Sequence, residues 1–508
     1  MIYNFNMSIG WISNGVEYAQ AYRAKVLRNI GQEARFIFLD MISSENIARI
    51  TEDMGFLDRE IIWLYTFFTN CRTSPVTYTL GQLERSLGTG KFAFFKKGNI
   101  VKYTFPGKEN FCIAYLENGE KEYVRQAEFI SNGRLIRKDY YTYCRIYSEY
   151  YAPVGQKAHL YQRRFFQEDG SVAYEEILDG DSVLYCFPDR QLYSKKELIG
   201  YMVSCLNLTE SDIVLLDGVK PEAARAILPN AAPAKIGVVI HAQHFWEEGT
   251  DENNILWNCQ YEYVFSQHKH IHFYMMSTDA QSRLFKEQFQ KYKNAAPVVA
   301  VIPVGSLSER KAPANPRKRH SLITASRLRP EKYVDFVIEA VAEARKQIPD
   351  LTLDIYGSGT EEIKLWELMT RLSCCDYVRL RGHRNLDDVY QNYEAYISAS
   401  AIETFGLTLM EAIGSGLAVI GFDVPYGNQN FIDDEKNGYK IPVNHGNRIF
   451  VEENEEREKR IQSLADRIVR LFTQADLEAF RRHSYKKAKQ YLAKEVEYKW
   501  NEFINQMI

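Results

Sequence analysis

The sequence lacks the features that mark secreted, membrane-spanning and nucleic-acid-binding proteins. Its first ten residues have neither a basic start nor a long apolar stretch, so they do not resemble a signal peptide. No run of about 18 apolar residues occurs, which argues against a transmembrane helix. The net charge is only −3 at pH 7, so no overall field attracts nucleic acid or anionic lipid. We therefore expect a cytoplasmic protein, with peripheral association at the inner face of the membrane left open.

Metal-binding and redox motifs are also scarce. The eight cysteines include no CxxC pair, so neither a zinc ribbon nor a redox motif is indicated, and we expect free thiols. Asp179-Gly180-Asp181 has the DxD spacing of metal-dependent glycosyltransferases, but it lies between β-favouring runs and has turn chemistry. We interpret it as a turn and expect neither a metal nor a bound cofactor.

The first half of the chain has the pattern of an α/β domain with a β-rich insertion. Ile2 to Ile9 is extended and apolar, the positions after Val16 follow helical spacing, and Ala34 to Leu39 resumes a strand. Such an opening favours a parallel sheet. From about residue 75 to 200, turn dipeptides such as Asn132-Gly133 separate tyrosine-rich runs without helical periodicity, which predicts antiparallel hairpins.

Parallel-strand patterns return in the second half. We expect buried strands at Ile213–Leu216, Ile236–Ile240 and Tyr261–Phe265. Strands and helices then alternate from Leu322 to Ile420, which predicts a doubly wound sheet whose ligand crevice lies beyond the carboxyl ends of its strands. Residues 306–319 are basic and contain proline, and we interpret them as a linker rather than an anion site.

The chain has 508 residues, more than the roughly 250–300 that one hydrophobic core supports. We therefore expect several domains, with boundaries where these patterns change. The expected parts are a first Rossmann-like domain in two pieces, 1–75 and 201–305; a β-rich insertion, 76–200; a second Rossmann-like domain, 306–490; and a carboxyl-terminal helix returning to the first domain, 491–508.

The stretch from Glu403 to Glu411 is the sharpest motif. Glu403 follows a predicted strand, and a helix begins near Phe405 with Glu411 on its second turn. The first backbone amides of such a helix form an anion site suited to a diphosphate. The two carboxylates could hold sugar and ribose hydroxyls on either side of it, although an amphipathic helix with incidental acids has the same spacing.

Two cations follow another strand of the same predicted sheet. Arg327 and Lys332 flank the segment Leu328-Arg329-Pro330-Glu331. Departure of a nucleoside diphosphate builds negative charge on its terminal phosphate, and fixed cations stabilise that charge. An arginine fork and a lysine point charge both suit phosphate, although ordinary loop charges would look alike.

Taken together, these motifs resemble glycosyltransferase family 4, a retaining family of GT-B fold. The matching pieces also include Gly357-Ser358-Gly359, Gly382-His383 and Asn437-Gly438. The resemblance implies two Rossmann-like domains facing a cleft, transfer from a UDP-sugar with retention of anomeric configuration, and no metal requirement. It assigns catalytic roles to His241, Arg327, Lys332 and Glu403, and donor binding to Gly15, Gly357, His383, Thr404, Phe405, Gly406, Leu407 and Glu411.

One loop departs from the family pattern. Members commonly have a Gly-Gly turn followed by a glutamate after the motif helix, whereas this sequence has no glutamate between Tyr426 and Ile432. Contacts from this loop to the acceptor or the sugar are therefore in doubt.

The amino-terminal segment and the insertion narrow the resemblance. Ile9 to Arg23, Ala34 to Met41 and the β-rich insertion resemble the catalytic subunits of accessory-secretion O-GlcNAc transferases, which modify serine-rich bacterial adhesins. This implies transfer of N-acetylglucosamine from UDP-GlcNAc to serine or threonine, with UDP-glucose as an alternative donor. It also implies a related, catalytically defective glycosyltransferase subunit as a partner.

Two other functions are compatible with many of the same sequence features. A teichoic-acid glycosyltransferase would share the GT-B core and a similar insertion, but the amino-terminal match favours the adhesin enzyme. A non-catalytic glycan-binding or chaperone subunit is disfavoured by the intact Arg327, Lys332, Glu403 and Glu411.

Overall fold

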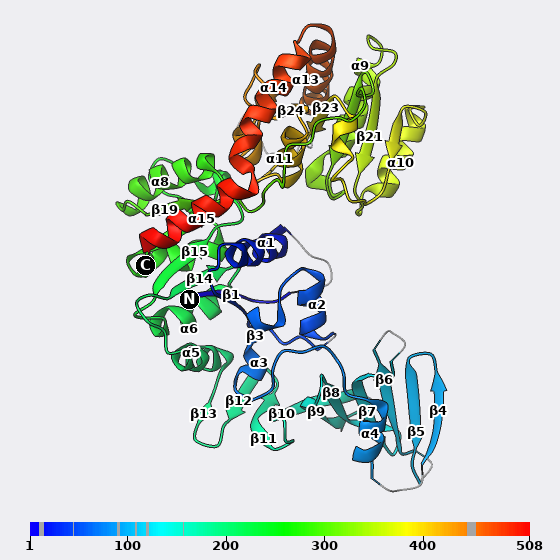
Figure 1. Ribbon diagram of the computed structural model, residues 1–508, viewed down its shortest axis with the longest axis vertical. Helices are drawn as coiled ribbons and strands as arrows, with labels where there is room; N and C mark the ends of the chain where they lie inside the picture. The colour runs from blue at the N-terminus through cyan, green and yellow to red at the C-terminus, as the bar shows by residue number, and fades with distance from the viewer. Residues whose placement is uncertain are drawn as a thin grey trace. The chain divides into compact units, whose positions relative to one another are not determined.

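The computed structural model divides by contact density into two compact units. Unit 1 covers Met1–Val238 and Tyr263–His272, and unit 2 covers Val239–Glu262 and Phe273–Gln506. Figure 1 shows two helix-flanked sheets and one large antiparallel sheet. The structure describes residues 1–9, 15–43, 45–88, 92–106, 109–117, 121–155, 157–443 and 454–507.

A seven-stranded sheet has the order β19-β18-β15-β14-β1-β2-β3. β1 pairs in parallel with both β2 and β14, so the chain runs outward to β3 and then restarts on the other side of β1. This reversal confirms the Rossmann-like arrangement predicted for the first domain. The strands are β1 (Ile2–Asn6), β2 (Ala34–Phe38), β3 (Ile61–Trp63), β14 (Ile213–Asp217), β15 (Lys235–Val239), β18 (Phe273–Met276) and β19 (Val299–Val301), and the longer helices between them are α1 (Gly15–Asn29), α5 (Lys195–Cys205), α6 (Pro221–Ile227) and α8 (Asp279–Lys293).

One expected strand of this region is wrong. Residues Tyr261–Phe265 lie inside a helix, α7 (Cys259–Ser266), and the next strand of the sheet is β18. The buried residues Tyr261, Val264 and Phe265 are spaced i, i+3 and i+4, which places them on one face of a helix. A short apolar run cannot by itself distinguish a buried strand from one buried helical face.

The predicted β-rich insertion is a ten-stranded sheet in which every strand pairs with its neighbours in sequence. At the turn between β7 and β8, Asn132 and Gly133 have φ values of 49° and 71°, as a two-residue hairpin of type I′ requires. Gly180 and Asp181 likewise link β11 to β12, which confirms the turn interpretation. The strands are β4 (Ala93–Lys97), β5 (Ile100–Thr104), β6 (Phe111–Leu116), β7 (Val124–Ser131), β8 (Arg134–Tyr141), β9 (Arg145–Val154), β10 (Lys157–Phe166), β11 (Val172–Asp179), β12 (Ser182–Cys186) and β13 (Gln191–Leu192).

A ladder of stacked aromatic rings accounts for part of the tyrosine content of this sheet. Tyr147 stacks on Phe165 with ring centroids 5.6 Å apart, Phe165 on Tyr174 at 4.5 Å, and Tyr174 on Phe187 at 4.7 Å. The Tyr174 hydroxyl donates to the carbonyl of Tyr65, 2.8 Å away, in α3 (Leu64–Phe67). The ladder therefore anchors the insertion to the chain from which it emerges.

A buried charge triad fixes the register of three central strands. Arg163 of β10 lies directly opposite Glu149 of β9 and Glu176 of β11. Its guanidinium donates to both carboxylates, at 2.9 and 2.7 Å. A slip of one residue would turn these charges to the other face, so the triad specifies the pairing.

A six-stranded parallel sheet forms the second Rossmann-like part expected from the sequence, with the order β22-β21-β20-β23-β24-β25. This is the Rossmann order 3-2-1-4-5-6, which places the topological switch point between β20 and β23. The strands are β20 (Ser321–Ala325), β21 (Thr352–Tyr356), β22 (Val378–Leu380), β23 (Ala395–Ser398), β24 (Ala418–Phe422) and β25 (Gly438–Ile441), and the helices are α9 (Val334–Ala344), α10 (Glu362–Arg371), α11 (Leu407–Gly414), α12 (Gly427–Phe431), α13 (Asn454–Thr473) and α14 (Leu477–Ala488). The last helix, α15 (Ala493–Met507), packs on the seven-stranded sheet instead, where the ring of Phe503 lies 4.8 Å from that of Phe273 in β18.

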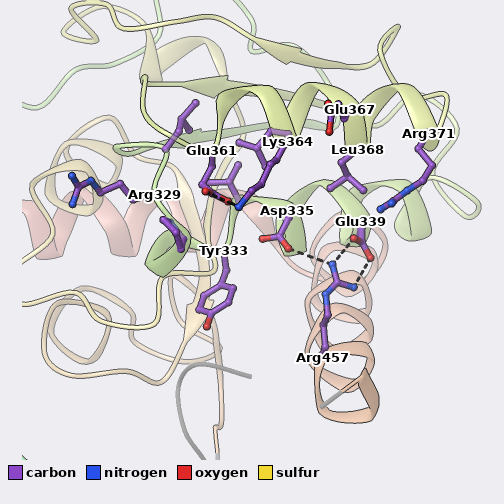
Figure 2. Close-up of a pocket in the computed structure, with 14 residues that line it drawn as sticks. Arg329, Tyr333, Asp335, Glu339, Glu361, Lys364, Glu367, Leu368, Arg371 and Arg457 are labelled. Atoms are coloured by element: carbon purple, nitrogen blue, oxygen red, sulfur yellow. Dashed lines mark hydrogen bonds and ion pairs between the residues drawn. The ribbon is translucent and has the colours of Figure 1, made fainter. Parts of the chain in front are cut away.

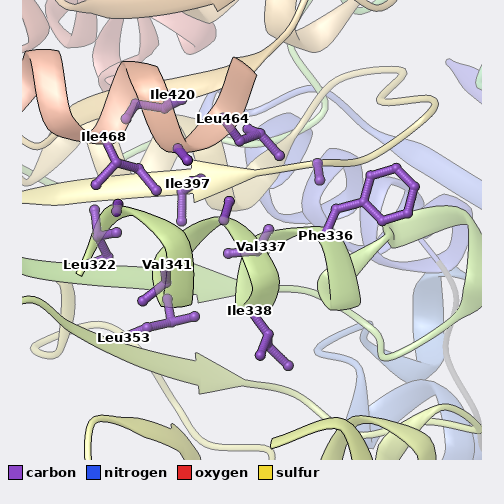
Figure 3. Packing of buried hydrophobic residues seen from close by; sticks show 14 of the residues in the cluster. Leu322, Phe336, Val337, Ile338, Val341, Leu353, Ile397, Ile420, Leu464 and Ile468 are labelled. Atoms are coloured by element: carbon purple, nitrogen blue, oxygen red, sulfur yellow. The ribbon is translucent and has the colours of Figure 1, made fainter. Parts of the chain in front are cut away.

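The core of this part lies between its sheet and two helices. Figure 3 shows Val337 and Val341 of α9 and Leu464 and Ile468 of α13 facing buried strand residues such as Ile397. The apolar residues of α9, which recur at helical spacing in the sequence, therefore form the buried face of this helix.

The basic segment 306–319 is bound to the sheet that follows it. The Arg317 guanidinium donates to the backbone carbonyls of Tyr393 and Ser415, and Lys311 pairs with Asp388 at 2.9 Å. Two of the segment's cations are therefore engaged by this part of the chain, whereas the linker expected from the sequence would leave them in water. Among the described residues, no helix has the length and apolarity that crossing a membrane demands.

The aromatic ladder gives a first prediction. Tyr174 is 1% exposed, so Tyr174→Ala should lower the free energy of unfolding by about 3–5 kcal/mol, as large-to-small aromatic substitutions do. Tyr161→Ala, on β10 and 40% exposed, should cost about 1 kcal/mol or less. Denaturant titration of both variants measures the difference, and equal losses would contradict an anchoring ladder.

Candidate active site

The predicted donor residues gather at the carboxyl ends of β20 and β23, the two strands that flank the switch point. Arg327 and Lys332 follow β20, and Glu403 follows β23. Open α/β sheets bind their ligands at this position. Topology therefore brings together two motifs that lie about 70 residues apart in the chain.

Lys332 and Glu403 form an ion pair, with Nζ 2.8 Å from Oε2. Their side chains are only 14% and 21% exposed, so each needs the other as a partner. Lys332 ends the short 3-10 turn Pro330–Lys332, and the proline at its first position is preset for that geometry. The pair places a cation and a carboxylate side by side at the switch point.

Two glycines let the loops after β20 and β21 touch along their backbones. A β-carbon on Gly357 would lie 1.8 Å from the carbonyl oxygen of Ser326, and one on Gly359 would lie 2.2 Å from that of Leu328. The amide of Leu328 donates to the carbonyl of Ser358 at 2.9 Å. Any other residue would push these loops apart, so the glycines hold the exposed Arg327 beside the turn at Gly357.

His383 is exposed and lies close to the same turn. The amide of Gly357 donates to the carbonyl of Gly382 at 3.0 Å, so the residue before His383 touches the glycine turn directly. Gly382 has a φ of 69°, a left-handed conformation that favours glycine. The structure thus groups Arg327, Gly357 and His383 along one sheet edge.

A second pair of glycines shapes the loop that carries Glu403. Gly406 precedes α11 with a φ of 91°, and a β-carbon there would lie 3.2 Å from Glu403 Cγ. A β-carbon on Gly427 would lie 2.1 Å from the carbonyl oxygen of Phe405. The amides of Tyr426 and Gly427 both donate to the carbonyl of Glu403, at 2.7 and 2.5 Å.

The first turn of α11 has the features of an anion site. The helix begins at Leu407, two residues later than the sequence predicts, because Gly406 is left-handed rather than helical. The amides of Phe405, Gly406 and Leu407 therefore surround a helix amino terminus, where the helix dipole favours negative charge. Thr404 is half-buried in the same loop.

Glu411 lies on the second turn of α11 in an apolar setting. Burial raises the pKa of its carboxyl to about 7, the nearby Tyr390 hydroxyl lowers it, and Asp387 raises it. Tyr390 is itself buried, in the short turn before β23. At neutral pH both the neutral and the ionised forms of this carboxyl are therefore populated.

His241 and Gly15 are the predicted residues furthest from this cluster in the chain. His241 is half-buried after β15, and its backbone amide donates to the Tyr261 hydroxyl at 3.1 Å, which restrains the backbone at this position. His241 belongs to unit 2, as Glu403 does, whereas Gly15 is exposed at the start of α1 in unit 1. Ser13 and Asn14, predicted to form the loop with Gly15, lie outside the described residues.

Sequence reasoning missed two tyrosines that touch the cluster. Tyr390 lies beside Glu411, and Tyr426 is paired with the backbone of Glu403. Neither stands in a recognisable motif. Tyr426 lies in the loop that departs from the family pattern, and that departure was the only signal that could have directed attention to it.

The donor cluster is separate from the pocket between α9, α10 and α13. Figure 2 shows Arg457 of α13 reaching Asp335 and Glu339 of α9, with Lys364 and Glu361 beside them. None of the predicted donor residues lines this pocket. Across the described part of the chain, no group of three or more histidine, cysteine or acidic side chains is arranged to hold a metal ion.

Comparison with known proteins agrees with this geometry. Residues 94–189 match the family described as the GtfA extended beta-sheet domain, and residues 306–476 match glycosyl transferases group 1. The chain is 46% identical over its whole length to the UDP-N-acetylglucosamine–peptide N-acetylglucosaminyltransferase GtfA subunit of Streptococcus gordonii, covering 98% of that protein.

Solved structures show the same similarity. A crystal structure of a GtfA/B complex contains a chain of 46% identity with a TM-score of 0.95, covering all of this chain and 99% of that one. The pneumococcal O-GlcNAc transferase GtfA, solved with UDP and GlcNAc, has 42% identity and a TM-score of 0.87, covering all of this chain and 98% of that one. The GT-B fold class predicted from the sequence is thereby confirmed, and the chain belongs to the family of GtfA subunits of UDP-N-acetylglucosamine–peptide N-acetylglucosaminyltransferases.

Proposed function

We propose that this enzyme transfers N-acetylglucosamine from UDP-GlcNAc to serine or threonine of a serine-rich adhesin polypeptide, with retention of anomeric configuration. Membership of a family of peptide N-acetylglucosaminyltransferases supports the donor and the peptide acceptor. The observation that carries the chemistry is the Lys332–Glu403 pair at the switch point, beside Arg327 and the amino terminus of α11. A teichoic-acid enzyme is disfavoured, because the 46% identity to a peptide transferase extends over the whole chain.

Each of the proposed donor residues is assigned to one part of the nucleotide-sugar. Arg327, Lys332 and the amides of Phe405, Gly406 and Leu407 hold the diphosphate. Glu411 accepts hydrogen bonds from the ribose hydroxyls, His383 lies at the uracil, and Gly357 admits the nucleotide close to the backbone. Glu403 and His241 contact the sugar, with Thr404 in the same loop as Glu403. Gly15, at the start of α1, is also assigned to donor binding.

The reaction exchanges one bond at the anomeric carbon for another. The bond between that carbon and the β-phosphate oxygen breaks, and the hydroxyl oxygen of the acceptor bonds to the same face of the carbon. The hydroxyl proton passes to the departing phosphate, which leaves as UDP. Arg327 and Lys332 stabilise the charge that grows on this phosphate, so the proposal needs no metal.

The enzyme acts with a related, catalytically defective subunit in the cytoplasm, either free or peripherally at the inner face of the membrane. Domain boundaries at residues 75, 200, 305 and 490 assign the donor chemistry to 306–490 and recognition of the partner or acceptor to 76–200. The edge strand β4 supports this role, because Phe94 and Phe95 are 65% and 66% exposed on it. Exposed aromatic residues on an unpaired edge are suited to a protein partner.

Assay of a UDP-sugar panel tests the main proposal. Transfer to a Ser/Thr-rich peptide should be fastest with UDP-GlcNAc, and hydrolysis of the same donor should persist without the peptide. Equal or faster transfer from UDP-glucose, or transfer to a polyol-phosphate polymer instead of the peptide, would contradict it.

Removal of either donor cation should impair the reaction. Arg327→Ala and Lys332→Ala should each lower kcat/KM about 10- to 150-fold, because a charge-assisted hydrogen bond contributes about 1.5–3 kcal/mol. Arg329→Ala is the matched control, since Arg329 is exposed in the same segment and lines the other pocket. Near-normal kinetics in both variants would place the diphosphate elsewhere.

Donor binding should strengthen as the pH rises through about 7, the raised pKa of Glu411. A raised pKa keeps this carboxyl neutral below that pH, and only its ionised form accepts hydrogen bonds from both ribose hydroxyls. Titration with UDP-GlcNAc measures the effect, since its phosphates are esterified, whereas the terminal phosphate of UDP itself titrates near pH 6. Glu411→Gln should weaken binding and flatten the profile, and an unchanged slope in that variant would assign the titration to another group.

Adding charge to the edge strand β4 should abolish partner binding and leave donor chemistry unchanged. The double variant Phe94→Lys, Phe95→Lys should lose co-purification with the partner subunit while hydrolysing UDP-GlcNAc normally, because buried lysine at an interface is costly. Tyr193→Lys is the control, being 67% exposed beside β13 at the opposite edge of the sheet. Retained association in the double variant would exclude β4 as the contact.

A further inference from the structure

His244 is a fully buried histidine whose two ring nitrogens both have partners. Nε2 lies 2.7 Å from Oε1 of Gln288 in α8, and Nδ1 lies 3.2 Å from the hydroxyl of Tyr426. Burial lowers the pKa of His244 to about 4, so the ring is neutral. Because the Gln288 oxygen only accepts, the ring proton lies on Nε2, and Nδ1 accepts from Tyr426.

Tyr426, one partner of this contact, is also hydrogen-bonded to the backbone of Glu403. Tyr426 is buried, and its ring is nearly parallel to that of His244, with an interplanar angle of 17° and centroids 6.1 Å apart. Its amide donates to the carbonyl of Glu403 at 2.7 Å, and the two residues form a parallel β-bridge. A movement of the Tyr426 ring would therefore be transmitted to the Glu403 backbone.

His244, the other partner, lies in a hydrogen-bonded segment that begins at His241, three residues earlier. The amides of His241 and Ala242 donate to the Tyr261 hydroxyl, at 3.1 and 3.2 Å. The carbonyl of Ala242 also accepts from the Gln281 side chain at 2.8 Å, and that of Gln243 from Asn258 at 2.9 Å. The backbone amide of Asn258 also donates to the carbonyl of His244 at 3.0 Å. Residues 241–244 are therefore held as one segment, so a shift of His244 would be passed along this segment to His241.

We propose that the Tyr426–His244 contact is a latch that holds Glu403 and His241 at the spacing required by the donor sugar. Both residues are positioning residues, since neither is assigned a contact with substrate. This inference rests on the proposed function, in which Glu403 and His241 face the sugar. It also gives a role to the loop that departs from the family pattern, because Tyr426 begins that loop.

The latch should affect turnover more than nucleotide affinity. Tyr426→Phe keeps the ring and removes the hydroxyl, so kcat for UDP-GlcNAc hydrolysis and for transfer should fall about 10- to 100-fold, the range expected for misplacement by a fraction of an ångström to 1 Å. The Kd for UDP should change less than about twofold, because Arg327, Lys332 and α11 are untouched. Thermal melting of each variant reports whether it is folded.

A matched control removes another hydroxyl that holds the same loop. Asn430 donates to the Tyr491 hydroxyl at 2.6 Å, and Tyr491 is linked to neither His244 nor the 241–244 segment by a contact seen in the described residues. Tyr491→Phe should therefore keep kcat near the wild-type value. Equal loss in both variants would show general loosening of the loop and overturn the latch.

A double-mutant cycle gives the second test. His244→Phe should lower kcat as Tyr426→Phe does, and the double variant should be no worse than either single variant, because all three lack the same bond. Additive losses, or a normal kcat in Tyr426→Phe, would overturn the latch. A wild-type enzyme that neither hydrolyses nor transfers from UDP-GlcNAc would instead refute the proposed function.

Discussion

The ion pair between Lys332 and Glu403 is the contact on which the donor end of this enzyme depends. Each side chain is largely withdrawn from water, and breaking such a pair leaves an uncompensated charge. The pair forms only because the loops after β20 and β23 meet at the switch point of a 3-2-1-4-5-6 sheet. In the proposed mechanism Lys332 stabilises the charge that grows on the departing phosphate, and Glu403 contacts the sugar.

Backbone proximity, more than side-chain choice, shapes the loops around this pair. Gly357 and Gly359 lie against the carbonyls of Ser326 and Leu328, and Gly427 lies against that of Phe405. Of these three, only Gly357 has a positive φ, so at the other two positions glycine is required by space rather than by conformation. The same close contacts bring the exposed Arg327, the mostly buried Lys332 and the helix amides to one edge, where they can act on a single phosphate group.

The insertion uses its aromatic residues in two physically distinct ways. Tyr147, Phe165 and Tyr174 stack in a buried ladder that fixes the sheet to its own unit. Phe94 and Phe95 remain exposed on the edge strand β4. The sequence shows only an abundance of aromatic residues, whereas the fold separates those that stabilise the sheet from those available to a partner.

The sequence alone determined the order of elements and the donor motif, because both are local. Apolar runs located most of the parallel strands, helical spacing located helices such as α9, and Asn132-Gly133 specified its hairpin. Glu403 to Glu411, with Arg327 and Lys332, identified the family. Local pattern failed at Tyr261–Phe265, where five residues fit a buried strand and a helical face equally well. Only the tertiary structure decided the pairing of Lys332 with Glu403, the raised pKa of Glu411 and the contact between Tyr426 and His244. That last contact joins residues 182 positions apart, and no local pattern encodes the burial or the neighbours that such a contact supplies.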